Sequence, residues 1–112
     1  MAKQLELKKN DLQPYYYGKV TDSFGAGVNI TGKTIYCTMK NLSTGTLKIN
    51  RQNSGISITD GLNGLFEYHW QAGDTDTVGK YTIEFEVGPD KFTVPKRPND
   101  AVVLILDSLD GQ

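Results

Sequence analysis

The residues with the clearest chemical potential stand in the stretch WQAGDTDTVGKY, residues 70–81, where Asp74 and Asp76 lie two positions apart. Three interpretations compete for them: a calcium loop, a catalytic carboxylate pair, and a structural turn. A calcium loop needs more oxygen ligands, a central glycine and a closing glutamate. A glycosidase pair needs two carboxyls across a cleft in different environments, and no apolar pocket is predicted around either acid. We therefore favour the turn.

Other catalytic or metal-binding sets are poorly represented. His69 is the only histidine and Cys37 the only cysteine, so a His/Cys zinc site and an internal disulfide both lack residues. No nucleophile elbow and no glycine-rich phosphate loop accompanies His69, which is expected on the outward face of a strand beside Glu67. Cys37 alternates with Ile35 and Met39, which predicts a small buried hydrophobe. We expect no enzyme, no cofactor and no metal.

A turn that joins two strands explains the same stretch. Gly79 opens an alternating segment, and Tyr81 follows it at the spacing of a tyrosine corner, in which the ring packs in the core and the hydroxyl bonds to an upstream backbone group. Such corners often carry an acid four residues before the tyrosine, and Thr77 holds that position here. Trp70 is the expected core ring at the other end of the turn. The residue two positions after Tyr81 is Ile83, so an antibody-type disulfide is absent from the prediction.

The elements that must position these residues follow a period of two. TIYCTMK, LFEYHW and KYTIEFEV alternate apolar with polar residues, and glycine- and asparagine-rich turns separate them. A tight turn is expected at Pro89 and Asp90, and an irregular crossing at residues 97–100. Strands are predicted near 3–8, 14–21, 33–40, 45–50, 56–59, 64–71, 79–88, 91–95 and 101–107. This pattern predicts an all-β fold, either a sandwich or a barrel, and the tyrosine corner favours a disulfide-free, immunoglobulin-like antiparallel β-sandwich.

Length and charge restrict the partners. The 112 residues fit one domain, 1–112, with frayed ends near 1–3 and 108–112. The net charge is −1, which argues against a nucleic-acid groove and against a polybasic membrane surface. No stretch has the apolar length of a membrane span, and MAKQLELKKN lacks the apolar middle of a signal peptide, so we expect no secretion by the Sec route.

Two segments could form a contact surface. The last strand, AVVLIL, has no polar face, so it is either a central strand or covered on one face by another subunit. PYYYGKV holds three successive tyrosines, which could stack on sugars or could fill the core and an interface. The residues expected at an interface are Val103, Ile105, Tyr16 and Tyr36.

The order of several blocks resembles a known family. VTDSFGAGVNITGKTIYCTMKN, then GISITDGLNGLFEYHWQAGDTDTVGKYTIEFEV, then a short hairpin and VPKRPNDAVVLIL are similar to the immunoglobulin-like N-terminal domain of phage baseplate upper proteins and related small virion proteins. The resemblance runs from about residue 5 to residue 107, and the second block is its most specific part. A long C-terminal extension like that of a baseplate arm is not part of this expectation, which favours a free-standing domain.

The resemblance implies a structural, non-enzymatic component of a tailed-phage virion, assembled in the cytoplasm of the host bacterium. It would act as a head decoration, a head–tail junction or neck protein, or a tail accessory protein. Its partners would be other virion proteins (capsid, portal or connector, or tail), and a homo-oligomer stays open. The alternative is a carbohydrate-binding module on a particle or cell surface, for which Tyr15, Tyr16 and Tyr17 would supply the rings.

Overall fold

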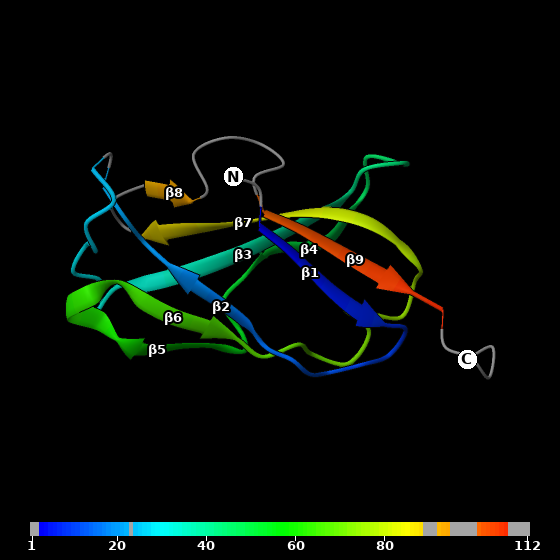
Figure 1. Ribbon diagram of the computed structural model, residues 1–112, viewed down its shortest axis with the longest axis horizontal. Helices are drawn as coiled ribbons and strands as arrows, with labels where there is room; N and C mark the ends of the chain where they lie inside the picture. Colours follow the sequence, from blue (N-terminus) through cyan, green and yellow to red (C-terminus); the bar gives the residue numbers. More distant parts are fainter. Residues whose placement is uncertain (1–2, 23, 89–91, 95–100, 108–112) are drawn as a thin grey trace.

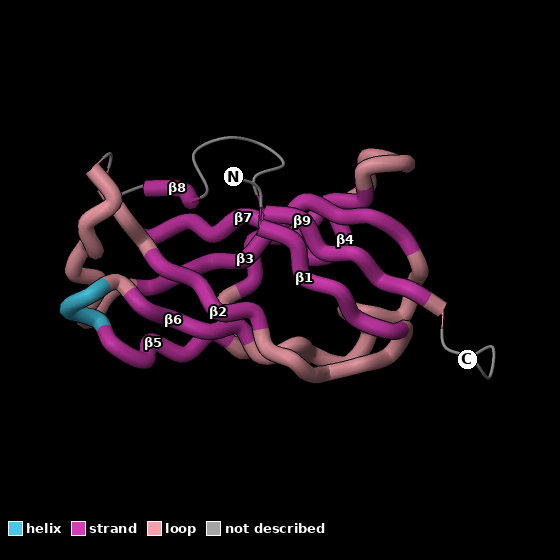
Figure 2. The backbone as a smooth tube through the Cα atoms, viewed as in Figure 1, coloured by secondary structure: helices cyan, strands magenta, loops and turns pink. Residues whose placement is uncertain are grey.

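The computed structural model describes residues 3–22, 24–88, 92–94 and 101–107 as a β-sandwich. Two sheets and one short 3₁₀ turn make up its regular structure (Figures 1 and 2). The elements are β1 (Lys3–Lys8), β2 (Tyr16–Lys19), β3 (Thr34–Asn41), β4 (Leu47–Gln52), β5 (Ile56–Asp60), η1 (Gly61–Asn63), β6 (Leu65–Tyr68), β7 (Gly79–Gly88), β8 (Phe92–Val94) and β9 (Ala101–Leu106).

All nine strands predicted from the sequence are present, and β1 and β7 have the predicted bounds. The immunoglobulin-like sandwich without a disulfide is confirmed, since Cys37 is a free, buried cysteine. The expected turn at Pro89 and Asp90, the crossing at 97–100 and the frayed tail at 108–112 lie outside the described residues.

The larger sheet has the strand order β1-β9-β7-β3-β4, and β8 pairs with β7 as well. The smaller sheet has the order β2-β6-β5. In Figure 1 the long strands β3 and β7 run along the molecule, with the small sheet toward one end and β1 and β9 toward the other. The pairing of β1 with β9 departs from the antiparallel expectation. These two strands, the first and the last, lie side by side and run in the same direction. Alternation alone cannot show this, since it is the same in either direction.

The core lies between the inward faces of the two sheets. Strand β7 contributes Tyr81, Ile83, Phe85 and Val87, which is the face predicted from the sequence, and β6 contributes Phe66 and Tyr68. Gly18 on β2 leaves room for the ring of its register partner Phe66 on β6. A Cβ at position 18 would lie 2.2 Å from Cζ of Phe66. Aromatic contacts at 4.8 Å (Phe66 with Phe85) and 5.0 Å (Tyr16 with Phe85) join the two sheets.

Candidate functional site

The predicted corner at residues 70–81 is present in the structure. The Tyr81 ring is buried, and its hydroxyl donates a 2.8 Å hydrogen bond to the backbone carbonyl of Thr77. Trp70 is also buried, and its indole N–H donates to the carbonyl of Pro14 at 2.9 Å. Gly79 is the first residue of β7. The stretch therefore joins the small sheet to the large one. Thr77 stands where related corners often carry an acid, and the Tyr81 hydroxyl bonds to its backbone carbonyl, so no acidic side chain is needed there.

The sequence predicts Asp74 as a turn residue without an apolar pocket around it, and the structure differs from this prediction. Its side chain is buried, and Oδ2 accepts hydrogen bonds from the Tyr68 hydroxyl and from the Gln71 backbone N–H at 2.8 Å. The physical reason is that Tyr68 points into the core, where its hydroxyl needs a partner. Burial, followed by the hydrogen bond to Asp74, raises the pKa of Tyr68 above its usual range.

Asp76 lies outside the core and serves a different contact. Its carboxylate pairs with the Lys48 ammonium on β4 and accepts a 2.8 Å hydrogen bond from the Thr77 hydroxyl. The hydrogen bond from Lys48 lowers the pKa of Asp76. Because one acid points into the core and the other outward, the pair does not converge on a common ligand. Within the described ranges, no group of three or more His, Cys, Asp or Glu side chains could hold a metal ion.

Thr75 connects the same stretch to the beginning of the chain. Its hydroxyl donates to the Asp11 carbonyl at 2.8 Å, and its own carbonyl accepts from the Asn10 backbone N–H at 2.8 Å. Together with the Lys48 contact, these bonds make residues 70–81 a structural clasp, by which we mean a loop whose side chains fasten β4 and the β1–β2 connection to the corner. Asp74, Thr75 and Asp76 therefore each have a structural contact within the clasp.

Three of the four residues expected at an interface lie in the chain's own core. Val103 and Ile105 are each 0% exposed, and Tyr16 is buried. Their assignment to an interface is therefore wrong: Val103 faces inward with its register partner Tyr81, and β9 is an internal strand between β1 and β7. Burial, with a smaller contribution from Cys37, raises the pKa of Tyr16 to about 12. The sequence could not choose between the two apolar faces of AVVLIL.

Tyr36 is the one member of that set that retains exposed surface. It is half-buried on the outer face of β3, and the Arg51 guanidinium lies 4.0 Å from the centre of its ring. Nε of Arg51 also donates a 3.0 Å hydrogen bond to Glu86. This outer face of the large sheet is thus partly occupied by its own cation–π and ion-pair contacts.

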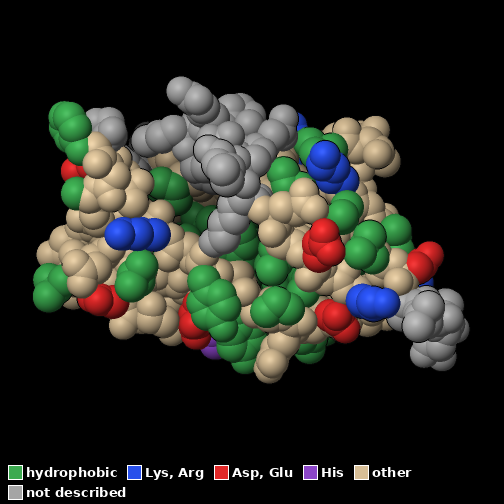
Figure 3. Space-filling model, viewed as in Figure 1, with side chains coloured by type: hydrophobic (Ala, Val, Ile, Leu, Met, Phe, Trp, Pro, Cys, Tyr) green, Lys and Arg blue, Asp and Glu red, His purple; other side chains and the backbone are tan. Residues whose placement is uncertain are grey.

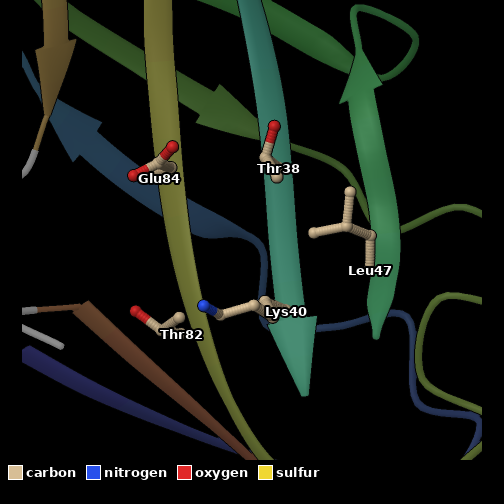
Figure 4. Close-up of a pocket in the computed structure, with 5 residues that line it drawn as sticks. All are labelled: Thr38, Lys40, Leu47, Thr82 and Glu84. Carbon is tan, nitrogen blue, oxygen red and sulfur yellow. The ribbon is translucent and has the colours of Figure 1, made fainter. Parts of the chain in front are cut away.

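The same outer face carries a shallow groove of about 270 Å³. Figure 4 shows its side chains standing on β3, β4 and β7: Thr38, Lys40, Leu47, Thr82 and Glu84. Threonine hydroxyls, one ammonium and one carboxylate stand here on an open sheet. The side chains that line the groove in the described part of the chain include no imidazole and no thiol.

A second polar and aromatic group lies on the outward face of the small sheet. His69 faces outward beside Glu67, as predicted, with Nε2 and Oε1 2.6 Å apart. Tyr15 stacks on the His69 ring at a centroid distance of 3.9 Å and an angle of 15°, a contact that the sequence did not indicate. Tyr17 lies 6.5 Å from Tyr15 and is 58% exposed. Figure 3 shows hydrophobic side chains next to the purple histidine at the lower edge of the view.

Cys37 has the environment predicted for it. The side chain is buried between Ile35 and Met39 on the inward face of β3. Burial, and then the charge of Asp74, raises the pKa of the thiol well above its usual value. A thiol that is hard to ionise is a poor nucleophile, so Cys37 acts in packing.

Comparison with models of known protein families finds no match, and a search of curated protein sequences finds none either. In the described part of the chain, no helix is long and apolar enough to cross a membrane.

Proposed function

We propose that this chain is a non-enzymatic docking domain of a tailed-phage virion, which binds a neighbouring particle protein along β1 and the adjacent outer face of β9. The observation that carries the proposal is the state of the β1 edge. Its six residues pair with β9 one by one, from Lys3 with Ala101 to Lys8 with Leu106, without a shift in register. A regular edge presents backbone groups to which another strand can add.

Two other edges are interrupted. The pairing of β4 with β3 shifts register twice, and Arg51 on β4 has a φ of +46°. The pairing of β5 with β6 shifts between Ile58 and Asp60. Such irregularities hinder the addition of a further strand. The edge of β2 is regular but only four residues long. Strand β1 is therefore the better template.

Apolar surface continues from this edge onto β9. Leu104 is half-buried and Leu106 is 38% exposed, and they are paired in register with Glu6 and Lys8 of β1. Leucines flanked by charges of both signs form a surface that a partner protein can cover while the isolated chain stays soluble in water. The sequence places the interface at Val103 and Ile105, whereas the proposal places it at Leu104 and Leu106, on the opposite face of the same strand.

The placement in a phage particle rests on the ordered sequence blocks described above and on the sandwich they imply. Docking by an edge and an apolar face needs no catalytic residue, and the clasp and the groove supply none. Partners are the capsid, the portal or connector, or a tail protein, and the site of action is the virion.

The test compares two exposed leucines. Leu106→Ser removes apolar surface from the proposed interface, whereas Leu62→Ser removes it from η1, on the small-sheet side of the chain. We expect mass spectrometry to find the wild-type chain and Leu62→Ser in purified phage particles, and Leu106→Ser at roughly one-tenth of that level or less, since an interface anchor contributes about 1–2 kcal/mol. Absence of the wild-type chain from the particles would refute the proposal.

A further inference from the structure

The outward face of the small sheet carries an aromatic and carboxylate group that the proposed docking surface does not use. It consists of Tyr15, Tyr17, Glu67 and His69, which we call the tyrosine–histidine patch. Tyr17 and Glu67 are direct register partners on β2 and β6. Tyr16, which lies between the two outward tyrosines, is buried in the core, so only two of the three rings belong to this surface.

The patch is held in place by its own contacts. Glu67 contacts the His69 imidazole at 2.6 Å, and the His69 ring stacks on Tyr15 at 3.9 Å. The backbone of His69 is fixed in turn by a 2.9 Å hydrogen bond from its N–H to the Gly55 carbonyl. A surface whose rings are already ordered loses less entropy when a ligand binds.

We propose that the tyrosine–histidine patch binds a saccharide, with a pyranose ring lying over Tyr17 and its hydroxyls directed toward Glu67 and His69. One face of a pyranose presents C–H groups, which pack against an aromatic ring and remove apolar area from water. Its rim presents hydroxyls, which a carboxylate can accept. A carboxylate has about four acceptor positions, and the His69 contact uses one oxygen, Oε1. Tyrosine suits such a site because its ring is apolar and its hydroxyl is polar.

The charges restrict the class of saccharide. Glu67 is the register partner of Tyr17, and the next outward residue along β2 is Lys19. A carboxylate at the centre of the patch repels phosphates and acidic sugars, which argues against nucleotides despite the stacking rings. Neutral and amino sugars are therefore the expected ligands, and uronic acids are expected to bind less well.

This site is independent of the docking proposal. The patch belongs to the small sheet, whereas the docking surface belongs to the β1–β9 edge of the large sheet. If Leu106→Ser had no effect on particle incorporation, the saccharide proposal would not be contradicted. If no sugar bound, the docking proposal would not be contradicted.

The experiment is a titration of the isotope-labelled chain with methyl glucoside, methyl galactoside, methyl N-acetylglucosaminide and methyl glucuronide, followed by NMR of the backbone amides. We expect at least one neutral sugar to shift the amides of Tyr15–Lys19 and Glu67–His69, with a dissociation constant on the order of 1 mM, as befits an open site. The glucuronide should bind at least about fivefold more weakly, because of Glu67.

Three variants make the test specific. Tyr17→Ser should weaken binding by roughly tenfold or more, since it removes the stacking ring. Glu67→Gln should reduce the preference for the neutral sugar over the glucuronide. Phe24→Ser is the matched control, because Phe24 is an exposed aromatic (93%) on the Thr21–Gly27 turn, outside the patch. It should bind like the wild type.

The proposal is overturned if no sugar shifts these amides at roughly 50 mM. It is also overturned if Tyr17→Ser binds as tightly as Phe24→Ser, or if the shifts map to the groove on the large sheet. Thermal unfolding of each variant shows that it is folded. Tyr15→Phe keeps the stacked ring and provides a second, milder variant, whose binding should stay within about threefold of the wild type if ring stacking dominates.

Discussion

The hydroxyl of Tyr81 donates a 2.8 Å hydrogen bond to the carbonyl of Thr77, four residues upstream, and so closes the corner between the two sheets. The ring itself is buried, so the hydroxyl has left water and needs this partner. Tyr81→Phe keeps the ring and removes only the bond. We expect the free energy of unfolding, measured with urea, to fall by about 1 kcal/mol.

Tyr15→Phe is the control for that measurement, because the Tyr15 ring stacks on His69 and contacts Tyr17 at a tilted angle on the outward face of the small sheet. Its stability should stay within about 0.5 kcal/mol of the wild type. Equal losses in the two variants would show that the corner bond contributes nothing of its own.

The buried carboxylate of Asp74 gives a second prediction. It accepts from the Tyr68 hydroxyl and from the Gln71 N–H, so Asp74→Ala leaves two donors without their partner. We expect a loss of about 2–4 kcal/mol, and a coupling of about 1–3 kcal/mol in a double-mutant cycle with Tyr68→Phe. Asp76→Ala, which removes an exposed partner of Lys48, should cost less than about 1 kcal/mol. Additive losses at Asp74 and Tyr68 would contradict the hydrogen bond.

Calcium should have no effect on the clasp. Asp74 is committed to core donors, and Asp76 is committed to Lys48, so the two carboxylates do not share a ligand position. We expect roughly 5 mM calcium to change the midpoint of thermal unfolding by less than about 1 °C in the wild type and in Asp76→Asn alike, since a ligand stabilises a protein only through binding to the native state. A rise of several degrees that Asp76→Asn abolishes would restore the calcium interpretation.

Gly18 tests the packing between β2 and β6. A Cβ added there would lie 2.2 Å from Cζ of Phe66, which is itself fixed in the core against Phe85. We expect Gly18→Ala to destabilise the chain by about 1–3 kcal/mol in urea unfolding, despite the usual gain from replacing a strand glycine. Lys19→Ala, at the exposed neighbouring position, is the control and should be nearly neutral. A stabilised Gly18→Ala variant would show that Phe66 can move.

Most of the fold could be predicted because alternation reports directly on a half-buried strand. The inward positions of Tyr81, Ile83 and Phe85 on β7 follow from this pattern alone. The pattern fails where both faces are apolar: Val103 and Ile105 turn inward because Tyr81 and Thr82 of β7 set the register of β9, which is long-range information. The parallel pairing of β1 with β9 has the same origin.

The candidate sites were predictable to different degrees. Residue spacing indicated the Tyr81 corner, since its hydrogen bond is local to four residues. It also placed Glu67 and His69 on one face. The stacking of Tyr15 on His69 joins residues 54 positions apart and depends on the pairing of β2 with β6. The burial of Asp74 could not be predicted either, because turn residues are usually exposed, and the donors that hold the carboxylate inside are the Tyr68 hydroxyl and the Gln71 N–H.

Alkaline conditions give the last prediction. Burial raises the pKa of Tyr16 from 10.0 to about 12, so between these values the unfolded chain releases a proton that the native chain retains. The unfolded state then binds fewer protons, and the free energy of unfolding must fall as pH rises. The contribution of Tyr16 to the free energy of unfolding, about 2–3 kcal/mol, is fully present below pH 10 and is lost as the pH rises toward 12. Tyr68, whose pKa is also raised, acts in the same direction.

Urea unfolding at pH 8 to 11.5 should therefore show a decline in the free energy of unfolding that is shallower in Tyr16→Phe than in the wild type. The comparison uses the slopes against pH, because the substitution also changes stability at neutral pH. An identical slope in the two chains would mean that Tyr16 ionises in the native state as readily as in the unfolded chain.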